Sequence, residues 1–298
     1  MSYKIISPTV TIIDENGKID LDANKKVIEF LLMNNIGGFA PFGSTGEFTE
    51  FSNDEKLELI KLYVEVVGGK VPVIAGTGNI NLKNTLDLSK KALDAGVDGL
   101  LILPPFYYAM GQEEAYNWYA RLAEELDGDI YIYNFPARTG LNIAPETIEK
   151  LVRKYPNIAG IKDTVDNAEN TKAIIYRIKK IKPDFKVYSG FDNQFVSNIL
   201  SGGDGNISAF SNIVPEIWAS WIKAAEEKDF NKVKRIQQMI DSLMPLYKIR
   251  PNFSKLFKIL MNKRGFNIST KSIFPFDEIS EKEVELATKI FSSVIDWE

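Results

Sequence analysis

The chain has 298 residues, of which 45% are hydrophobic, 26% charged and 11% aromatic, a composition typical of a soluble globular protein and not of disordered, collagen-like or coiled-coil chains. Its 36 Lys and Arg against 40 Asp and Glu give a net charge of −4, so nucleic acid is not an expected partner. The absence of Cys and His excludes a thiolate nucleophile, an imidazole base and the usual zinc ligands.

Apolar runs rich in strand-forming residues alternate along the chain with amphipathic segments. The runs predict eight strands, at residues 3–6, 38–41, 71–75, 99–103, 130–133, 158–162, 186–189 and 205–208. The segments between them predict helices at 21–35, 53–67, 81–95, 112–126, 144–155, 167–181, 193–201 and 215–227. No run has the length of a membrane span and the first residues lack a signal-peptide core, so we expect a cytoplasmic protein with no membrane partner.

Strand and helix alternate at a spacing of roughly 30 residues, and residues 1–227 fall in the size range of a (β/α)₈ TIM barrel, an α/β fold. An open doubly wound sheet is the competing arrangement, which the absence of a G-x-G-x-x-G segment before a first helix disfavours. Residues 228–298 predict three more helices, with an apolar pattern from Val233 to Leu246. We expect these helices to form an appended C-terminal bundle packed on the barrel.

Two candidate catalytic side chains, Lys162 and Tyr133, end consecutive apolar runs, where a barrel places its active site. Desolvation in a barrel mouth would make Lys162 a candidate Schiff-base nucleophile, whereas the alternative is a lysine that reaches the rim and pairs with Asp163. Tyr133 lies on the same strand face as Tyr131 and could relay protons. The alternative for Tyr133 is a core aromatic whose hydroxyl bonds a backbone acceptor.

The loop after the second strand contains Ser44, Thr45 and Gly46. Two hydroxyls and free backbone N–H groups at the start of a helix make it a candidate cradle for a small carboxylate. The alternative is a structural turn in which the hydroxyls act as local caps.

Two more polar or aromatic groups follow neighbouring strands. Arg138 lies five residues beyond Tyr133 and could bind a second carboxylate, or it is a solvated charge at the rim. Tyr107 belongs to the aromatic group at 106–108, which is a packing feature, an oligomer contact or the source of a hydroxyl for a neighbouring site.

Five segments together resemble the dihydrodipicolinate synthase and N-acetylneuraminate lyase family of pyruvate-dependent class I aldolases. They are GSTGE at 43–47, YNFP at 133–136, GIKDT at 160–164, YSGFD at 188–192 and GGDGNIS at 202–208. The resemblance implies that Lys162 forms an imine with pyruvate and that Tyr133 relays protons to the imine, the enamine and the aldehyde oxygen. It also implies that Ser44 and Thr45 hold the pyruvate carboxylate and that Ile207 adds a backbone contact.

The same resemblance implies a homotetramer built as a dimer of dimers. In it, Tyr107 crosses an interface and completes a hydroxyl relay through Ser44 of its neighbour. Because a protonated imine is itself an electron sink, the resemblance implies neither a metal ion nor an organic cofactor.

The choice of branch within the family depends on a few positions. Arg138 matches the residue with which the synthases bind the carboxylate of aspartate semialdehyde. Phe48, Asp163-Thr164 and the segment 252–255 depart from the synthase pattern, and the combined motifs resemble the 2-keto-3-deoxygluconate aldolase-like branch. We therefore expect cleavage of a 2-keto-3-deoxy sugar acid to pyruvate and an aldehyde, with the synthase as the alternative. A catalytically silent barrel that binds small molecules is a third hypothesis.

Overall fold

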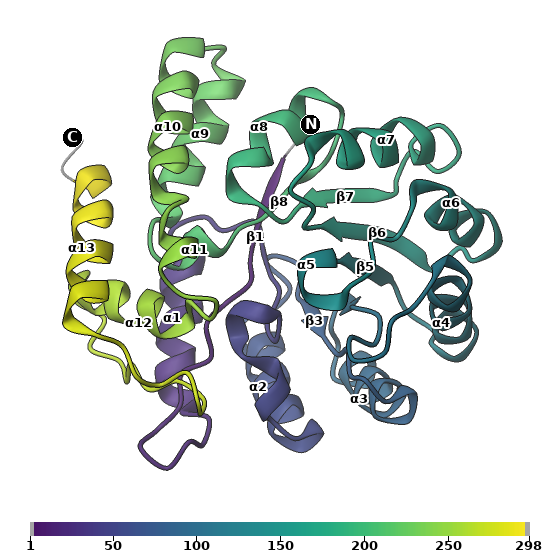
Figure 1. The fold of residues 1–298 in the computed structure, drawn as a ribbon, viewed down its shortest axis with the longest axis horizontal. Helices are drawn as coiled ribbons and strands as arrows, with labels where there is room; N and C mark the ends of the chain where they lie inside the picture. Colours follow the sequence, from purple (N-terminus) through teal and green to yellow (C-terminus); the bar gives the residue numbers. More distant parts are fainter. Residues whose placement is uncertain (1–2, 296–298) are drawn as a thin grey trace.

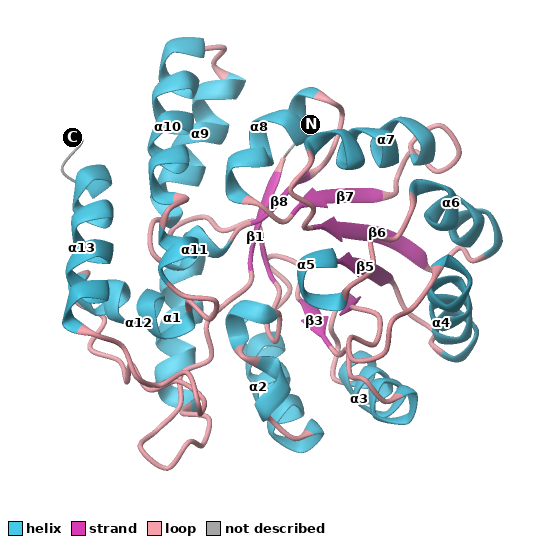
Figure 2. Ribbon diagram, in the orientation of Figure 1, coloured by secondary structure: helices cyan, strands magenta, loops and turns pink. Residues whose placement is uncertain are grey.

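The computed structural model describes residues 3–295 and contains an eight-stranded parallel sheet (Figures 1 and 2). The strands are β1 (Lys4–Ser7), β2 (Gly38–Phe39), β3 (Ile74–Gly76), β4 (Gly99–Ile102), β5 (Ile130–Asn134), β6 (Ile158–Asp163), β7 (Lys186–Ser189) and β8 (Gly205–Ile207). Each strand except β2 pairs with the next in sequence, β1 pairs with β8, and a single bridge between Phe39 of β2 and Val73, the residue before β3, spans the remaining gap. The sheet is therefore a nearly closed barrel, and the predicted TIM barrel is confirmed.

Helices follow the strands, and all of them except the single-turn α5 cover the outside of the barrel (Figure 2). They are α1 (Leu21–Met33), α2 (Asn53–Val67), α3 (Leu82–Asp94), α4 (Gln112–Glu125), α5 (Pro136–Thr139), α6 (Pro145–Lys154), α7 (Ala168–Ile178), α8 (Phe195–Leu200) and α9 (Pro215–Glu226). Helix α2 begins where the sequence indicates, because the Ser52 hydroxyl accepts from the amide of Glu55 while the Glu55 carboxylate accepts from the amide of Ser52. The single-turn helix α5, which the sequence did not predict, follows β5 directly.

Large side chains fill the inside of the barrel. Tyr131 and Tyr133 both point inward from β5, as strand alternation predicts. Tyr131 has room because β4 and β6 carry glycines beside it, and a Cβ atom on Gly160 would lie 2.6 Å from its ring. The ring centroids of Tyr131 and Tyr188 lie 6.4 Å apart, so the axis of the barrel is packed with aromatic side chains.

The C-terminal part contains α10 (Phe230–Leu243), α11 (Leu246–Ile249), α12 (Ser254–Lys263) and α13 (Glu281–Ile295), so the described residues hold four helices here where three were predicted. The apolar pattern from Val233 to Leu246 spans the end of one helix and the start of the next, because Pro245 separates α10 from α11. Helices α10, α12 and α13 lie together on one side of the barrel (Figure 1). Tyr247 of α11 stacks on Phe210, which follows β8, with ring centroids 4.8 Å apart.

None of the helices formed by residues 3–295 combines the length and the apolar character needed to cross a membrane.

Candidate active site

Lys162 lies near the carboxyl end of β6 with 4% of its surface exposed. The β5–β6 register pairs it with Tyr133, and its Nζ atom lies 4.4 Å from the centroid of the Tyr133 ring. No carboxylate of the described residues forms an ion pair with it, and the alternative pairing with Asp163 is wrong. The amine is thus held inside the barrel against an aromatic face.

Asp163 faces the other side of β6 because successive side chains of a strand alternate. Its carboxylate accepts from Thr171 Oγ1 at 2.6 Å, from Asn134 Nδ2 at 2.8 Å and from Asn170 Nδ2 at 3.1 Å. Burial raises the pKa of this carboxyl, and the three donors act against that rise. The contacts join β5, β6 and α7 directly behind Lys162, which fixes the end of the strand that carries it.

The hydroxyl of Tyr133 lies 3.3 Å from the Oγ atom of Ser44, and 2% of the Tyr133 side chain is exposed. Tyr119 shows the alternative arrangement, since its hydroxyl donates to the backbone carbonyl of Ile102 at 2.8 Å. Tyr133 makes no such backbone bond within the described residues. Its hydroxyl can therefore pass a proton between Ser44 and a molecule beside Lys162.

The loop after β2 forms a short 3₁₀ helix at Ser44–Gly46. The amides of Ser44 and Thr45 donate to no acceptor of the described residues, whereas the amide of Gly46 donates to the carbonyl of Gly43 at 3.0 Å. Thr45 is buried and its carbonyl accepts from Ser254 Oγ at 2.9 Å. The first two residues can offer N–H groups to a carboxylate, but the Gly46 amide is already bonded.

These groups line one cavity of about 280 Å³. The lining contains Lys162, Tyr133, Ser44, Thr45, Arg138 and Ile207, which the sequence predicted, but neither Gly46 nor Tyr107. It also contains Pro8, Phe135, Ala137, Thr164, Gly190, Phe191, Ala209, Tyr247, Pro251 and Phe253. Among the described lining residues two are cationic and none is acidic, which suits an anionic substrate. No cluster of acidic side chains within residues 3–295 has an arrangement that could hold a metal ion.

A second cavity of about 230 Å³ adjoins the first and shares Ser44, Arg138, Pro251 and Phe253 with it. Aromatic and aliphatic side chains form much of its wall, among them Phe48, Leu103, Phe106, Ile273 and Phe276. The two cavities together offer space for the two halves of a substrate, one beside Lys162 and one farther out.

Arg138 lies at the boundary of the two cavities and is exposed. Its Nη2 atom donates to the carbonyl of Pro251 at 2.7 Å, and its guanidinium carbon lies 5.7 Å from the ring centroid of Phe135. One arm of the guanidinium is thus already bonded within the protein, so a substrate carboxylate would have to use the remaining N–H groups.

Tyr107 is 81% exposed, and its ring packs edge-on against that of the equally exposed Tyr108 with centroids 5.1 Å apart. Within one chain its hydroxyl has no contact with Ser44. The exposed aromatic pair is available for contact with another molecule.

Sequence reasoning missed a buried network beside Lys162. The Asp192 carboxylate accepts from Tyr247 Oη at 2.5 Å, from the Ser208 hydroxyl and from the amide of Phe210 at 3.4 Å. Burial raises the pKa of Asp192 to about 6, although the charge of Lys162 lowers it. Asp192 stands in the YSGFD segment, but no local pattern shows that Tyr247 of α11 meets it.

We expect the Asp192→Asn variant to gain stability relative to the wild type as the pH rises. The pKa of Asp192 is raised in the folded state from its ordinary value of 3.8, so its contribution is full below pH 4 and is lost as the pH passes 6. The isosteric amide removes this loss, which amounts to at most about 3 kcal/mol. Urea unfolding at pH 5 and pH 7.5 measures the difference, and a difference that does not change with pH would contradict the assignment.

The chain is similar to known proteins over nearly its whole length. Residues 1–293 match the model of the dihydrodipicolinate synthetase family. A 4-hydroxy-tetrahydrodipicolinate synthase of Kosmotoga olearia is 35% identical over 275 residues, 92% of each chain. The putative 2-dehydro-3-deoxy-D-gluconate aldolase YagE of Escherichia coli is 30% identical over 285 residues, 95% of this chain and 94% of its own.

The crystal structure of YagE in complex with pyruvate superposes with a TM-score of 0.94 at 28% identity and covers 98% of both chains. The similarity thus extends over the barrel and the C-terminal helices alike. Members of the matched family are pyruvate-dependent lyases, and the cationic cavity around Lys162 suits such a substrate. The chain belongs to the dihydrodipicolinate synthetase family.

Proposed function

We propose that this enzyme cleaves a 2-keto-3-deoxy sugar acid, such as 2-keto-3-deoxygluconate, to pyruvate and an aldehyde through a Schiff base on Lys162. The observation that carries the proposal is the buried amine of Lys162 beside the Tyr133–Ser44 hydroxyl pair in a cationic cavity. A cavity with two cations favours a keto acid, and a buried amine without a carboxylate partner is free to attack its carbonyl.

The reaction follows from this placement. The Lys162 amine adds to the keto carbon, and the Tyr133 phenol donates its proton to the departing hydroxyl, so that water leaves and a protonated imine forms beside the Tyr133 phenolate. The Tyr133 oxygen takes the proton of the C4 hydroxyl, the C3–C4 bond breaks, and its electron pair moves into the imine to give an enamine and a free aldehyde. Protonation of the enamine at C3 and addition of water then release pyruvate and restore the amine. The amides of Ser44 and Thr45 hold the carboxylate throughout.

Two observations favour the sugar acid over aspartate semialdehyde as the second half of the substrate. One N–H group of the Arg138 guanidinium is already bonded to the carbonyl of Pro251, which leaves fewer of its five N–H groups for a substrate carboxylate. A putative 2-dehydro-3-deoxy-D-gluconate aldolase and a probable 2-dehydro-3-deoxy-D-pentonate aldolase of E. coli, each 30% identical, stand among the relatives.

The synthase activity is the second candidate, and the place of Arg138 in the lining of both cavities supports it. A synthase would condense the pyruvate enamine with aspartate semialdehyde. The two candidates are separated by a product assay on the wild-type enzyme. We expect release of pyruvate from 2-keto-3-deoxygluconate to be faster than consumption of aspartate semialdehyde with pyruvate, and the reverse order would favour the synthase.

The Arg138→Ala variant separates the candidates independently. We expect kcat/KM to fall by a similar factor, roughly 3- to 10-fold, with a sugar acid and with the semialdehyde, because the lost hydrogen bond to Pro251 loosens a wall that both substrates touch. If Arg138 instead binds a substrate carboxylate, the loss is roughly 10- to 150-fold and confined to the semialdehyde. Parallel steady-state assays of both substrates distinguish these outcomes.

We also propose a homotetramer built as a dimer of dimers, in which Tyr107 reaches Ser44 of a neighbouring subunit. The proposal is supported by the exposure of Tyr107 and Tyr108 and by the hydroxyl pair of Ser44 and Tyr133, which a third hydroxyl could extend.

Subunit mixing tests this sharing of residues. Tyr107→Phe and Lys162→Ala homo-oligomers are each expected to be nearly inactive, but a mixed oligomer contains some sites with both groups intact. We expect mixing to restore part of the activity. Native mass spectrometry verifies that the subunits exchange, and exchange without recovery would count against a shared site.

A further inference from the structure

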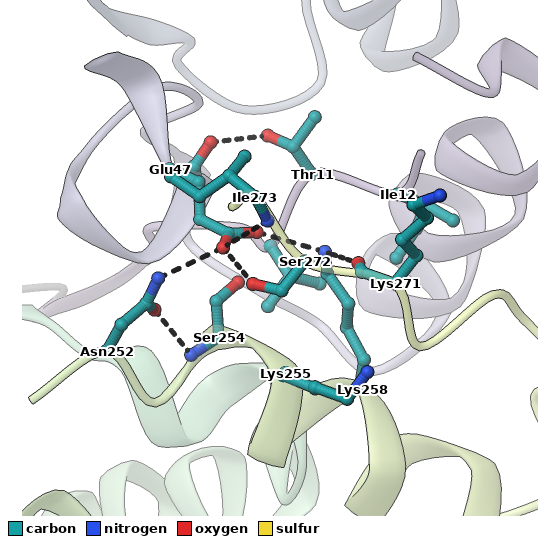
Figure 3. Close-up of polar contacts among 12 residues, drawn as sticks. Thr11, Ile12, Glu47, Asn252, Ser254, Lys255, Lys258, Lys271, Ser272 and Ile273 are labelled. Atoms are coloured by element: carbon teal, nitrogen blue, oxygen red, sulfur yellow. Dashed lines mark hydrogen bonds and ion pairs between the residues drawn. The ribbon is translucent and has the colours of Figure 1, made fainter. Parts of the chain in front are cut away.

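Glu47 follows the Ser44–Gly46 cradle directly, and 4% of it is exposed. It has a φ of 54°, in the left-handed region that residues other than glycine rarely adopt. Its Oε2 atom lies 3.0 Å from Nζ of Lys258, a residue of α12 with no exposed surface (Figure 3). The loop that would hold pyruvate thus ends in a buried ion pair with the C-terminal helices.

The other oxygen of Glu47 is equally occupied. Oε1 accepts from Asn252 Nδ2 at 3.0 Å, from the amide of Ile273 at 3.3 Å and from the hydroxyl of Ser272 (Figure 3). Together with Lys258, these donors come from three separate segments of the C-terminal part. One carboxylate therefore joins the loop after β2 to residues more than 200 positions away in the sequence.

The carboxylate of Glu47 is held in its charged form, whereas burial lowers the pKa of Lys258 against the opposing charge of Glu47. Burial acts to raise the pKa of Glu47, but Lys258 and the donors around the carboxylate outweigh burial and lower it. Lys258 also donates to the carbonyl of Lys271 at 2.7 Å, so its ammonium has two acceptors. A buried ion pair adds little net stability compared with an apolar pair, but it fixes geometry strongly because either charge alone would be costly.

The contacts of Glu47 reach both cavities. On one side they fix the end of the loop whose Ser44 and Thr45 line the cavity of Lys162. On the other side Asn252 stands between Pro251 and Phe253, which line both cavities. We infer that Glu47 is a positioning residue that holds the pyruvate-binding loop and the adjacent substrate wall in a fixed position relative to each other, with Lys258 as its counter-ion. This inference rests on the proposed function.

The test measures how imine formation depends on pyruvate concentration, by borohydride trapping and intact mass, together with the melting temperature. We expect Glu47→Gln to raise the half-saturating pyruvate concentration about tenfold or more while the maximal trapping rate changes less than about threefold. Asp204→Asn is the matched control. Asp204 is a partly buried carboxylate that binds Lys179 at 2.7 Å and Lys186 at 3.3 Å beside the amino end of β8, away from the cavity. The Asp204→Asn variant should have a lower melting temperature than the wild type and the same half-saturating pyruvate concentration.

The double variant Glu47→Gln/Lys258→Met removes both charges. It therefore distinguishes a role of the pair in positioning the pyruvate-binding loop from a role in stabilising the fold. We expect it to recover melting temperature but to keep a raised half-saturating pyruvate concentration. If the double variant recovered both the melting temperature and the wild-type half-saturating pyruvate concentration, the pair would only stabilise the fold and the inference would be overturned. The inference would also be overturned if Glu47→Gln, like Asp204→Asn, lowered the melting temperature without changing the half-saturating pyruvate concentration.

Asn252→Ala provides a milder change should the Glu47 variants not fold. It removes one donor to Glu47, and we expect a rise of about threefold in the half-saturating concentration; no rise would contradict the inference. Absence of any adduct in the wild type would contradict the proposed function itself, and this inference would fall with it. A normal wild-type adduct with an unchanged pyruvate dependence in the variants would overturn the inference alone.

Discussion

The Lys162→Ala variant is expected to lose pyruvate adduct formation completely and to lower kcat/KM on the order of 10⁴-fold or more, because the covalent intermediate has no other anchor in the cavity. Wild-type enzyme treated with pyruvate and borohydride should gain one adduct per chain, and peptide mapping should place it on Lys162. This result would also exclude the hypothesis of a silent binding protein.

Lys56 of α2 supplies a demanding control. It is 2% exposed, its ammonium lies 5.5 Å from the ring centroid of Phe48, and burial lowers its pKa to about 8. A lowered pKa makes an amine reactive, so pKa alone would point to Lys56. Lys56 does not line the cavity that holds Tyr133 and Ser44. We therefore expect Lys56→Met to keep the adduct, and an adduct that survives in Lys162→Ala would refute the assignment.

The Tyr133→Phe variant is expected to lower kcat by roughly 10²- to 10⁴-fold while leaving the half-saturating pyruvate concentration nearly unchanged. The ring that packs on Lys162 stays, so the variant removes the hydroxyl beside Ser44 and little else. Steady-state kinetics with the preferred keto acid, combined with pyruvate trapping, separate the loss of proton transfer from a loss of binding.

Tyr119→Phe is the matched control, because Tyr119 is also fully buried but bonds the carbonyl of Ile102. It should cost about 1 kcal/mol of stability and leave kcat unchanged. If Tyr133→Phe retained wild-type kcat, the hydroxyl would have a structural role and Tyr133 would not be the proton relay.

The sequence was sufficient to predict the barrel and the place of Lys162 and Tyr133. Strand alternation puts Tyr133 inside with Tyr131, and consecutive strands of a barrel are neighbours, so the closeness of β5 and β6 follows from the order of the elements. The register that pairs Tyr133 with Lys162 does not follow from it, because it shifts by one residue between Ile130 and Tyr131. The pattern could not show that the amide of Gly46 bonds Gly43, because hydrogen bonding inside a tight turn depends on its backbone angles.

The outer walls of the site could not be predicted for a different reason. Arg138 and Pro251 are 113 residues apart, and their contact depends on how the helices after the barrel pack. The hydrogen bond from Tyr247 of α11 to Asp192 depends on the packing of these helices as well. Apolar periodicity predicts that such helices exist and which face they bury, but not which barrel loop each one meets.

The division of the site between Lys162 and Tyr133 on barrel strands and Pro251 and Phe253 in the C-terminal part has an evolutionary consequence. The proposed bond-making groups and one part of the outer cavity wall are encoded in separate stretches of the gene, because residues of the C-terminal part join barrel residues such as Phe48 and Phe106 around the second cavity. Mutations in the later stretch can alter the aldehyde partner while the pyruvate chemistry stays intact. A single ancestral barrel can in this way give rise to enzymes that share one nucleophile and differ in the second molecule they accept.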